Sequence, residues 1–266
     1  MKRCPPPKFA SFAEWPAPAL DLYPHLSYIP WRTSRGCVNS CAYCATPFLC
    51  PRFEETLPAH AADAFLKLYD LRPAPDVAFY DDALLVNASK RLLPFLDHVC
   101  TALPNLRWHT PNGMHVRCVT APIAERLYAA GFTTLRLGLE TVNPARLAST
   151  GPKYAFNDVA RCLSALTAAG FRPNTIGVYL LMGLPGQTVD EVRTAILYTR
   201  EYLGLNVKLA EYSPVPHTSL WPAAVAESPV PIAREPLWHN NSLLPLRSPT
   251  FSQEIITDLR ALAAGH

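Results

Sequence analysis

The sequence predicts an α/β fold, specifically a partial (β/α)6 TIM-like barrel of parallel strands with outer helices. Short apolar runs of strand character alternate six times with stretches of helical periodicity, which is the pattern of a parallel sheet wrapped by helices. Six units are fewer than the eight of a complete barrel. A chain of 266 residues with 49% hydrophobic content is long enough for one such domain.

Each predicted strand is a short apolar run that ends at a glycine, a proline, an asparagine or an acidic residue. Because active sites of parallel barrels lie at the carboxyl ends of the strands, these strand ends are the expected functional rim. The strands are expected at residues 27–35, 76–80, 106–109, 134–139, 175–182 and 206–212.

The helices are predicted from apolar positions that recur near every 3.6 residues. Asn87 and Asn157 are expected as N-caps of two helices, and Gly131 and Gly170 as the residues that stop two others. The helices are expected at about residues 54–71, 89–103, 121–130, 157–169, 189–203 and 250–263.

Three regions are expected along the chain. Residues 1–26 form a proline-rich lead-in, residues 27–215 the barrel core, and residues 216–266 a covering segment with a final helix. Many of the 28 prolines fall in the lead-in, around residues 213–249 and at element boundaries, where they punctuate the chain. The stretch 213–249 is expected to cover the cavity of the barrel.

The bulk composition narrows the class of protein. The net charge of +3 is dispersed without a block of like charges, so nucleic acid is not expected as a partner. No run of eighteen apolar residues is present, and no membrane span is expected. The N-terminus lacks the apolar core of a signal peptide, which predicts a cytoplasmic protein with reduced thiols.

Residues 31–50 contain the chemically most specific pattern. Cys37, Cys41 and Cys44 are separated by three and then two residues, so three thiolates can wrap one metal centre from a single loop. Cys50 adds a fourth thiol and leaves a closed zinc site as an alternative, although zinc sites usually show two separated CxxC pairs. Metal sites with an open coordination position are typically catalytic, and closed ones structural.

A strand followed by Cys-x3-Cys-x2-Cys, with Tyr43 just before the third cysteine, resembles the radical S-adenosylmethionine (SAM) enzymes. In that superfamily the three cysteines hold three irons of a [4Fe–4S] cluster, and the fourth iron takes the amino and carboxylate groups of SAM. The resemblance implies that Cys37, Cys41 and Cys44 are the metal ligands and that the cofactors are a [4Fe–4S] cluster and SAM. It also implies an electron donor of the flavodoxin or ferredoxin type.

The resemblance further implies contacts to SAM at the strand ends. Asp81 or Asp82 would accept from the SAM amine, with capping of the next segment as the alternative role. Glu140 suits the ribose hydroxyls, and Arg136 or Lys153 suits the carboxylate. The expected cofactor contacts are Tyr43, Tyr80, Asp81, Asp82, Asn112, Arg136, Glu140, Gly183 and Tyr212.

Two other features lie at the expected rim. GLPGQT at residues 183–188 lacks the lysine and spacing of a phosphate-binding loop, which excludes nucleotide hydrolysis, and its glycines are expected to admit the adenosine. His109 and His115 bracket the Asn112-Gly113 turn, where they could face the substrate cavity. A lone histidine is more often a surface or hydrogen-bonded residue.

The resemblance covers about residues 27–222 and extends to the radical SAM core of proteins that carry an N-terminal cobalamin-binding domain. The segments that carry this resemblance are TSRGC, FYDDALL, HTPNG, RLGLET, GLPGQT and EYSPVPHTSLW. Only 36 residues precede Cys37, so we expect this chain to bind SAM but not cobalamin.

The implied reaction is reductive cleavage of SAM, followed by hydrogen abstraction from a small-molecule or peptide substrate that the sequence does not name. Three alternatives remain open. The chain could be the core of a cobalamin-dependent radical methyltransferase that acts with a separate cobalamin domain. It could be a non-catalytic subunit that keeps the barrel and the cluster. It could also be a zinc-stabilised binding module without enzymatic activity.

Overall fold

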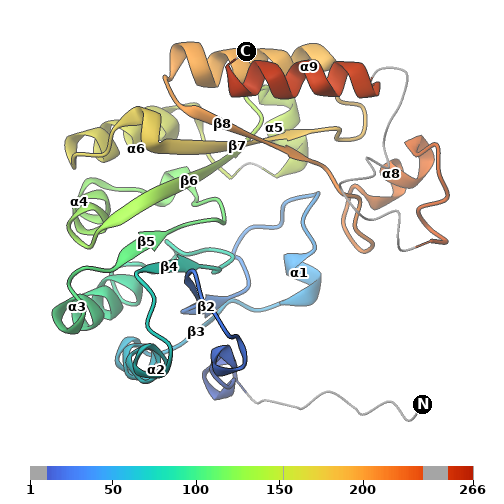
Figure 1. Ribbon diagram of the computed structural model, residues 1–266. Helices are drawn as coiled ribbons and strands as arrows, with labels where there is room; N and C mark the ends of the chain where they lie inside the picture. Colours follow the sequence, from blue (N-terminus) through green and yellow to red (C-terminus); the bar gives the residue numbers. More distant parts are fainter. Residues whose placement is uncertain (1–10, 152, 236–250, 266) are drawn as a thin grey trace, which may run out of the picture.

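The computed structural model describes residues 11–151, 153–235 and 251–265. Its centre is a six-stranded parallel sheet whose strands lie side by side in the order in which they occur in the chain (Figure 1). This arrangement confirms the predicted partial barrel. The strands are β1 (Ile29–Trp31), β4 (Asp76–Phe79), β5 (Arg107–His109), β6 (Phe132–Glu140), β7 (Ile176–Met182) and β8 (Asn206–Glu211).

Helices cover the outer face of the sheet, while the carboxyl ends of the strands point towards the side that carries α1 (Thr46–Leu49) and α8 (Trp221–Glu227) (Figure 1). Each crossover returns the chain to the amino end of the next strand, which is why the sheet is parallel. The covering helices are α2 (Pro58–Leu71), α3 (Leu92–Ala102), α4 (Ala121–Ala129), α6 (Phe156–Ala168), α7 (Val189–Leu197) with its π-helical continuation η5 (Tyr198–Tyr202), and α9 (Gln253–Ala264).

The hydrophobic core fills the space between the sheet and these helices. Trp108 on β5 is fully buried, and its ring centroid lies 5.2 Å from that of Phe79 on β4 and 5.9 Å from that of Phe65 on α2. On β6, Leu135 and its alternate neighbours Leu137 and Leu139 are also buried in this layer. Because side chains alternate along a strand, the residues between them face the inside of the barrel.

Several helix boundaries differ from the predictions. Residues 54–55 are not helical but form β3 (Glu54–Glu55), which pairs antiparallel with β2 (Ser34–Arg35). Asn87 is not an N-cap: its φ is 52°, and Arg91 occupies the N-cap of α3. Asn157 lies inside α6, whose N-cap is Ala155. A side chain that can cap does so only where the tertiary structure starts the helix.

The predicted ends of two helices at glycine residues are confirmed. Gly131 and Gly170 follow α4 and α6 with φ values of 91° and 110°, which glycine adopts without a steric penalty. The structure adds short elements that periodicity did not indicate: α1, α5 (Pro144–Thr150), α8, η1 (Phe12–Glu14), η2 (Leu20–Leu22), η3 (Val116–Cys118) and η4 (Pro173–Thr175). Such short elements carry too few apolar repeats to be recognised by period.

The two flanking regions are described in part. In the lead-in, Phe12 and Leu20 are buried against the body of the barrel. In the C-terminal region, α8 packs through Ala224 against Leu184 and Tyr212. The expectation that residues 213–249 cover the cavity falls partly on residues 236–249, which lie outside the described ranges. Within the described ranges, the helices are too short or too polar to cross a membrane.

Candidate active site

The loop that carries the cysteines is framed by the β2–β3 hairpin, in which Ser34 pairs with Glu55 and Arg35 with Glu54. Gly36 begins this loop with a φ of 82°, and a Cβ added there would lie 2.4 Å from the Arg52 carbonyl oxygen. Only glycine combines this backbone conformation with so close an approach. The hairpin therefore closes the two ends of the loop on each other at the carboxyl end of β1.

Three thiols of the loop are near enough to influence one another. Burial raises the pKa of Cys37, and neighbouring Cys41 and Cys44 raise it further. Burial also raises the pKa of Cys41, while the cationic Lys153 works in the opposite direction. The uncharged thiol is thus favoured at Cys37 and Cys41 until a metal centre or other positive charge stabilises their thiolates.

Cys50 stands apart from these three. Its sulfur accepts a hydrogen bond from Arg35 Nε at 3.1 Å. Across the described ranges, no three His, Cys, Asp or Glu side chains are grouped so that they could hold a metal ion. This applies to Cys37, Cys41 and Cys44 as well, so it does not separate a three-thiol cluster from a four-cysteine zinc site; what sets Cys50 apart is its hydrogen bond with Arg35. The donor set of three thiols on one loop fits a larger cluster with one position left open.

A buried ion pair faces the cysteine loop across the rim. Lys153 Nζ lies 2.8 Å from a Glu140 carboxylate oxygen and 5.5 Å from the Tyr43 ring centroid. Burial lowers the pKa of Lys153, but Glu140 and the Cys41 sulfur outweigh this effect and raise it overall, so Lys153 is a cation. Glu140 has a φ of 68°, a strained conformation for a residue with a side chain.

Gly138 explains how this pair fits over β6. A Cβ on Gly138 would lie 2.9 Å from a Glu140 carboxylate oxygen and 3.5 Å from Lys153 Nζ. The missing side chain lets the Glu140 carboxylate fold back over its own strand, where the β6–β7 register also shifts. The sequence motif RLGLET therefore places the Lys153–Glu140 ion pair opposite the thiols, and we call this pair the cofactor cradle.

The adjacent carboxylates Asp81 and Asp82 have different roles. Asp81 is 2% exposed. Its carboxylate accepts hydrogen bonds from the backbone N–H of Thr33, the hydroxyl of Thr33, the hydroxyl of Ser34 and the guanidinium of Arg91. The expectation that Asp81 contacts SAM is therefore corrected, because its carboxylate is enclosed and fully used in the fold. Asp82 is half-buried and accepts from the Gly36 N–H at 2.9 Å, which tethers the start of the cysteine loop.

Tyr80 and Asn112 lie at the ends of β4 and β5 on the same rim. The Tyr80 hydroxyl lies 3.0 Å from the Tyr28 hydroxyl, and Asn112 Nδ2 donates to the Asp81 carbonyl at 3.2 Å. Asn112 thus links two neighbouring strand ends. The structure brings both residues to the rim, as the sequence predicted, and their contact with SAM stays a prediction.

Gly183, Tyr43 and Tyr212 surround the far side of the rim. Gly183 has a φ of 83° and begins a turn closed by the Gln187 side chain, which donates to the Leu181 carbonyl at 3.1 Å. The buried hydroxyls of Tyr43 and Tyr212 lie next to the Cys41 thiol and to Thr218, respectively, and among the described residues neither has a partner in good hydrogen-bond geometry. Buried donors of this kind, next to three thiols and a cationic lysine, fit a polar cofactor.

His115 is a rim residue whose role sequence reasoning left open. Its Nε2 lies 3.9 Å from Cys37 Sγ and 3.2 Å from Asn39 Nδ2. Burial, together with Lys153 and Arg117, lowers the pKa of His115 to about 4, so the imidazole is neutral at pH 7. The position of His115 after the HTPNG turn is the signal that placed it near the cavity.

Two cavities adjoin the rim. The inner cavity, of about 530 Å³, lies on the inside of the sheet, and we define it by its lining residues: Ser27, Tyr28, Asp76, Ala78, Tyr80, His109, Pro111, Thr134, Arg136 and Tyr179. Arg136 thus belongs to the inner cavity. It precedes Glu140 by four residues on β6, and its contact with SAM stays a prediction.

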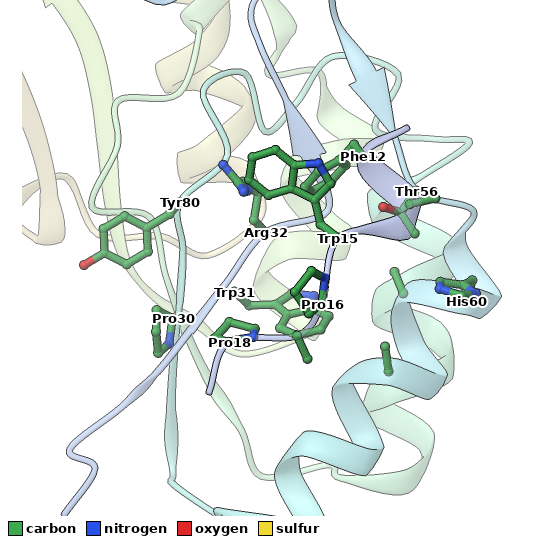
Figure 2. A pocket seen from close by; sticks show the side chains of 14 residues that line it. Phe12, Trp15, Pro16, Pro18, Pro30, Trp31, Arg32, Thr56, His60 and Tyr80 are labelled. Atoms are coloured by element: carbon green, nitrogen blue, oxygen red, sulfur yellow. The ribbon is translucent and has the colours of Figure 1, made fainter. Parts of the chain in front are cut away.

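The outer cavity, of about 260 Å³, lies between the lead-in, β1 and α2. Figure 2 shows that mainly aromatic and proline side chains line it, with Trp31 below and Tyr80 at one side. The Arg32 guanidinium lies 4.9 Å from the Phe12 ring centroid and so holds the lead-in over the cavity. We regard this cavity as part of the packing of the lead-in.

A family model described as "Radical SAM superfamily" matches residues 31–198. No curated protein matches the sequence. Among solved structures, the radical SAM methyltransferase TsrM from Kitasatospora setae, with tryptophan substrate and a SAM analogue bound, superposes with a TM-score of 0.64 at 20% identity. That match covers 75% of this chain and 39% of TsrM.

Two further structures are similar in fold. The radical SAM enzyme coproporphyrinogen III oxidase (HemN) from Escherichia coli gives a TM-score of 0.58 at 15% identity, covering 91% of this chain and 53% of HemN. The cobalamin-dependent SAM radical enzyme OxsB gives 0.55 at 16% identity, covering 71% of this chain and 29% of OxsB. The chain therefore spans about half or less of the length of these structures.

Proposed function

The chain belongs to the radical SAM superfamily, and on that premise we propose that it is an enzyme that abstracts a hydrogen atom from a substrate held inside the partial barrel. Enzymes of this superfamily use a [4Fe–4S] cluster and SAM, which are the cofactors of this chain, and they require a reductant. The observation that carries the proposal is the meeting of three thiols and a buried lysine–glutamate pair at the carboxyl ends of the strands.

When bound, the cluster and SAM supply reductive cleavage of SAM to methionine and a deoxyadenosyl radical. The chain's own residues would hold and orient the cluster and SAM. Cys37, Cys41 and Cys44 would bind three irons, and Lys153 would offset the negative charge of the thiolates. Glu140 would accept from the ribose hydroxyls of SAM. These groups would fix the cofactors at one end of the barrel, so that a substrate bound inside the barrel meets SAM at a single position.

The test is SAM cleavage by anaerobically reconstituted protein. With dithionite as reductant, or a flavodoxin or ferredoxin as the natural class of donor, the protein is expected to release deoxyadenosine and methionine. The triple variant Cys37→Ala, Cys41→Ala, Cys44→Ala is the matched negative control. Iron and sulfide in the purified protein with zinc absent support the cluster. Stoichiometric zinc without sulfide would support the zinc-stabilised binding module instead.

A second candidate function is radical methyl transfer with cobalamin, and the fold similarity to TsrM and OxsB favours it. TsrM has been solved with cobalamin and a [4Fe–4S] cluster bound, and OxsB is described as cobalamin-dependent. In this candidate, cobalamin would come from a domain outside the described barrel. The products separate the candidates: methyl transfer through cobalamin also converts SAM to S-adenosylhomocysteine, whereas hydrogen abstraction alone yields deoxyadenosine and methionine. Stoichiometric co-elution of added cobalamin with this chain in gel filtration would also favour methyl transfer.

A further inference from the structure

The inner cavity contains a cation, Arg136, that has no carboxylate partner among the described residues. The guanidinium of Arg136 donates to the Leu135 carbonyl at 3.1 Å, and within the described ranges it forms no ion pair with Asp or Glu. An arginine that lines a cavity is costly to leave unpaired, because its donors match carboxylates in geometry and charge. A ligand with a negative charge would satisfy it.

Asp76, the one acidic residue that lines the cavity, cannot serve as the negatively charged partner of Arg136. Asp76 accepts from Arg107 Nε and Nη2, both at 2.6 Å, and lies 2.8 Å from His109 Nε2. The Arg107 guanidinium holds the pKa of Asp76 well below its usual range, so the carboxylate stays ionised and paired. Asp76 and Arg107 neutralise each other, which leaves the charge of Arg136 uncompensated within the cavity.

Gly177 fixes the position of this arginine. Gly177 is in register with Arg136 on the neighbouring strand β7, and an added Cβ would lie 2.6 Å from Arg136 Nη1 and 2.7 Å from Arg136 Cδ. A glycine inside a strand weakens it, and here it permits the close approach of a side chain. The arginine therefore lies flat against β7 instead of extending away from the sheet.

Three tyrosines give the cavity its walls. The hydroxyls of Tyr28 and Tyr80 lie 3.0 Å apart, and the Tyr179 hydroxyl donates to the Pro111 carbonyl at 2.7 Å. Because these hydroxyls are already paired, the rings offer mainly flat apolar surface. A volume of about 530 Å³ with one charged anchor is typical of a small-molecule site.

The cavity lies directly behind the rim. A Cβ on Gly113 would lie 3.1 Å from the Gly138 Cα and 3.3 Å from a Tyr179 ring carbon, so the Tyr179 ring is packed next to these glycines. Glu140 and Lys153 lie over the same Gly138. A ligand anchored at Arg136 would therefore have its other end directed towards the cofactor cradle.

We propose that the inner cavity binds a small molecule that carries a carboxylate, with Arg136 as the anchor of the carboxylate and Tyr28, Tyr80 and Tyr179 against its body. This inference rests on the proposed function and names its substrate class. A carboxylate is preferred to a phosphate dianion because Arg136 is the single unpaired cation that lines the cavity within the described ranges.

The test is calorimetric titration of the reconstituted full chain with phenylacetate and with its uncharged isostere phenylacetamide. Phenylacetate is expected to bind about tenfold or more tightly than the amide, and to lose about tenfold or more in affinity in Arg136→Gln. Gly177→Ala keeps the charge but displaces the arginine, and it is expected to weaken binding in the same direction. Arg172→Gln, at an exposed position, is the matched control and should bind as the wild type does.

Three results would overturn the inference: no phenylacetate binding, equal affinity for the acid and the amide, or affinity that Arg136→Gln leaves unchanged. Tighter Arg136-dependent binding of phenyl phosphate would overturn the choice of a carboxylate. SAM cleavage is measured on the same preparations. Cleavage without carboxylate binding rejects this inference alone, whereas Arg136-dependent binding without cleavage rejects the proposed function alone.

Discussion

Lys153 and Glu140 form an ion pair at the rim of the barrel, with 2.8 Å between Lys153 Nζ and a Glu140 carboxylate oxygen, although Glu140 ends β6 and Lys153 lies in the loop between α5 and α6. Both side chains are mostly buried, with 12% and 15% exposure. Glu140 has a strained backbone conformation, and its pairing with Lys153 places a positive charge opposite the cysteine loop. Its removal is the most direct test of the cradle.

Lys153→Met is expected to weaken SAM binding by about 1.5–3 kcal/mol, because a charge-assisted contact is lost and Glu140 is left without its partner. Calorimetry of the reconstituted protein with SAM measures the effect. Lys67→Met, which removes an exposed lysine on α2, is the control and should leave SAM affinity unchanged. Equal SAM affinity in the wild type and Lys153→Met would show that the cradle does not hold SAM.

The neighbours Asp81 and Asp82 are expected to differ when each is replaced by alanine. Asp81→Ala should lower the free energy of unfolding by about 3–5 kcal/mol, because it leaves buried Arg91 and the Thr33 donors without this acceptor. Asp82→Ala should leave the fold intact and weaken SAM binding, because Gly36 at the start of the loop loses its tether. Denaturant unfolding and calorimetry together check both; a stable Asp81→Ala protein would contradict the structural role.

The cysteine variants test which thiols hold the cluster. Cys37→Ala, Cys41→Ala and Cys44→Ala are each expected to remove the brown iron–sulfur absorbance after reconstitution. Cys50→Ala should keep it, because the Cys50 sulfur is engaged with Arg35 instead. Iron and sulfide analysis provides the measurement. If Cys50→Ala also lost all iron, a four-cysteine site would be the better description.

Asp76 predicts a dependence of stability on pH. Arg107 and His109 face its carboxylate, and Arg107 in particular lowers its pKa below the ordinary 3.8. A carboxyl whose pKa is lowered by folding stabilises the protein fully above the ordinary value, and this contribution disappears as the pH falls towards the folded value. The stability difference between wild type and Asp76→Asn should therefore be constant near neutrality and shrink below about pH 4. A stability difference between the two proteins that stays unchanged in acid would contradict this role of Asp76.

The sequence alone determined the order of the strands and the identity of the cysteine loop. Strand and helix patterns are local, because alternation and 3.6-residue periodicity come from backbone geometry, and a six-fold β–α alternation leaves few arrangements other than a parallel sheet. The Cys37, Cys41 and Cys44 spacing is also local, since one short loop must supply all three thiols. Gly131 and Gly170 likewise ended their helices as predicted, because a positive φ is a property of the single residue.

The tertiary structure decided what each polar residue at a strand end does. Asp81 and Asp82 are adjacent in sequence, yet one is enclosed by Thr33, Ser34 and Arg91 while the other tethers Gly36. Arg136 and Glu140 are four residues apart on one strand, but Arg136 lines the inner cavity while Glu140 pairs with Lys153 at the rim. These outcomes depend on partners far away in the chain, and no local pattern encodes them. Burial and pairing, which follow from the packing of strands onto one another, assigned these side chains to the fold, the cofactor cradle or the inner cavity.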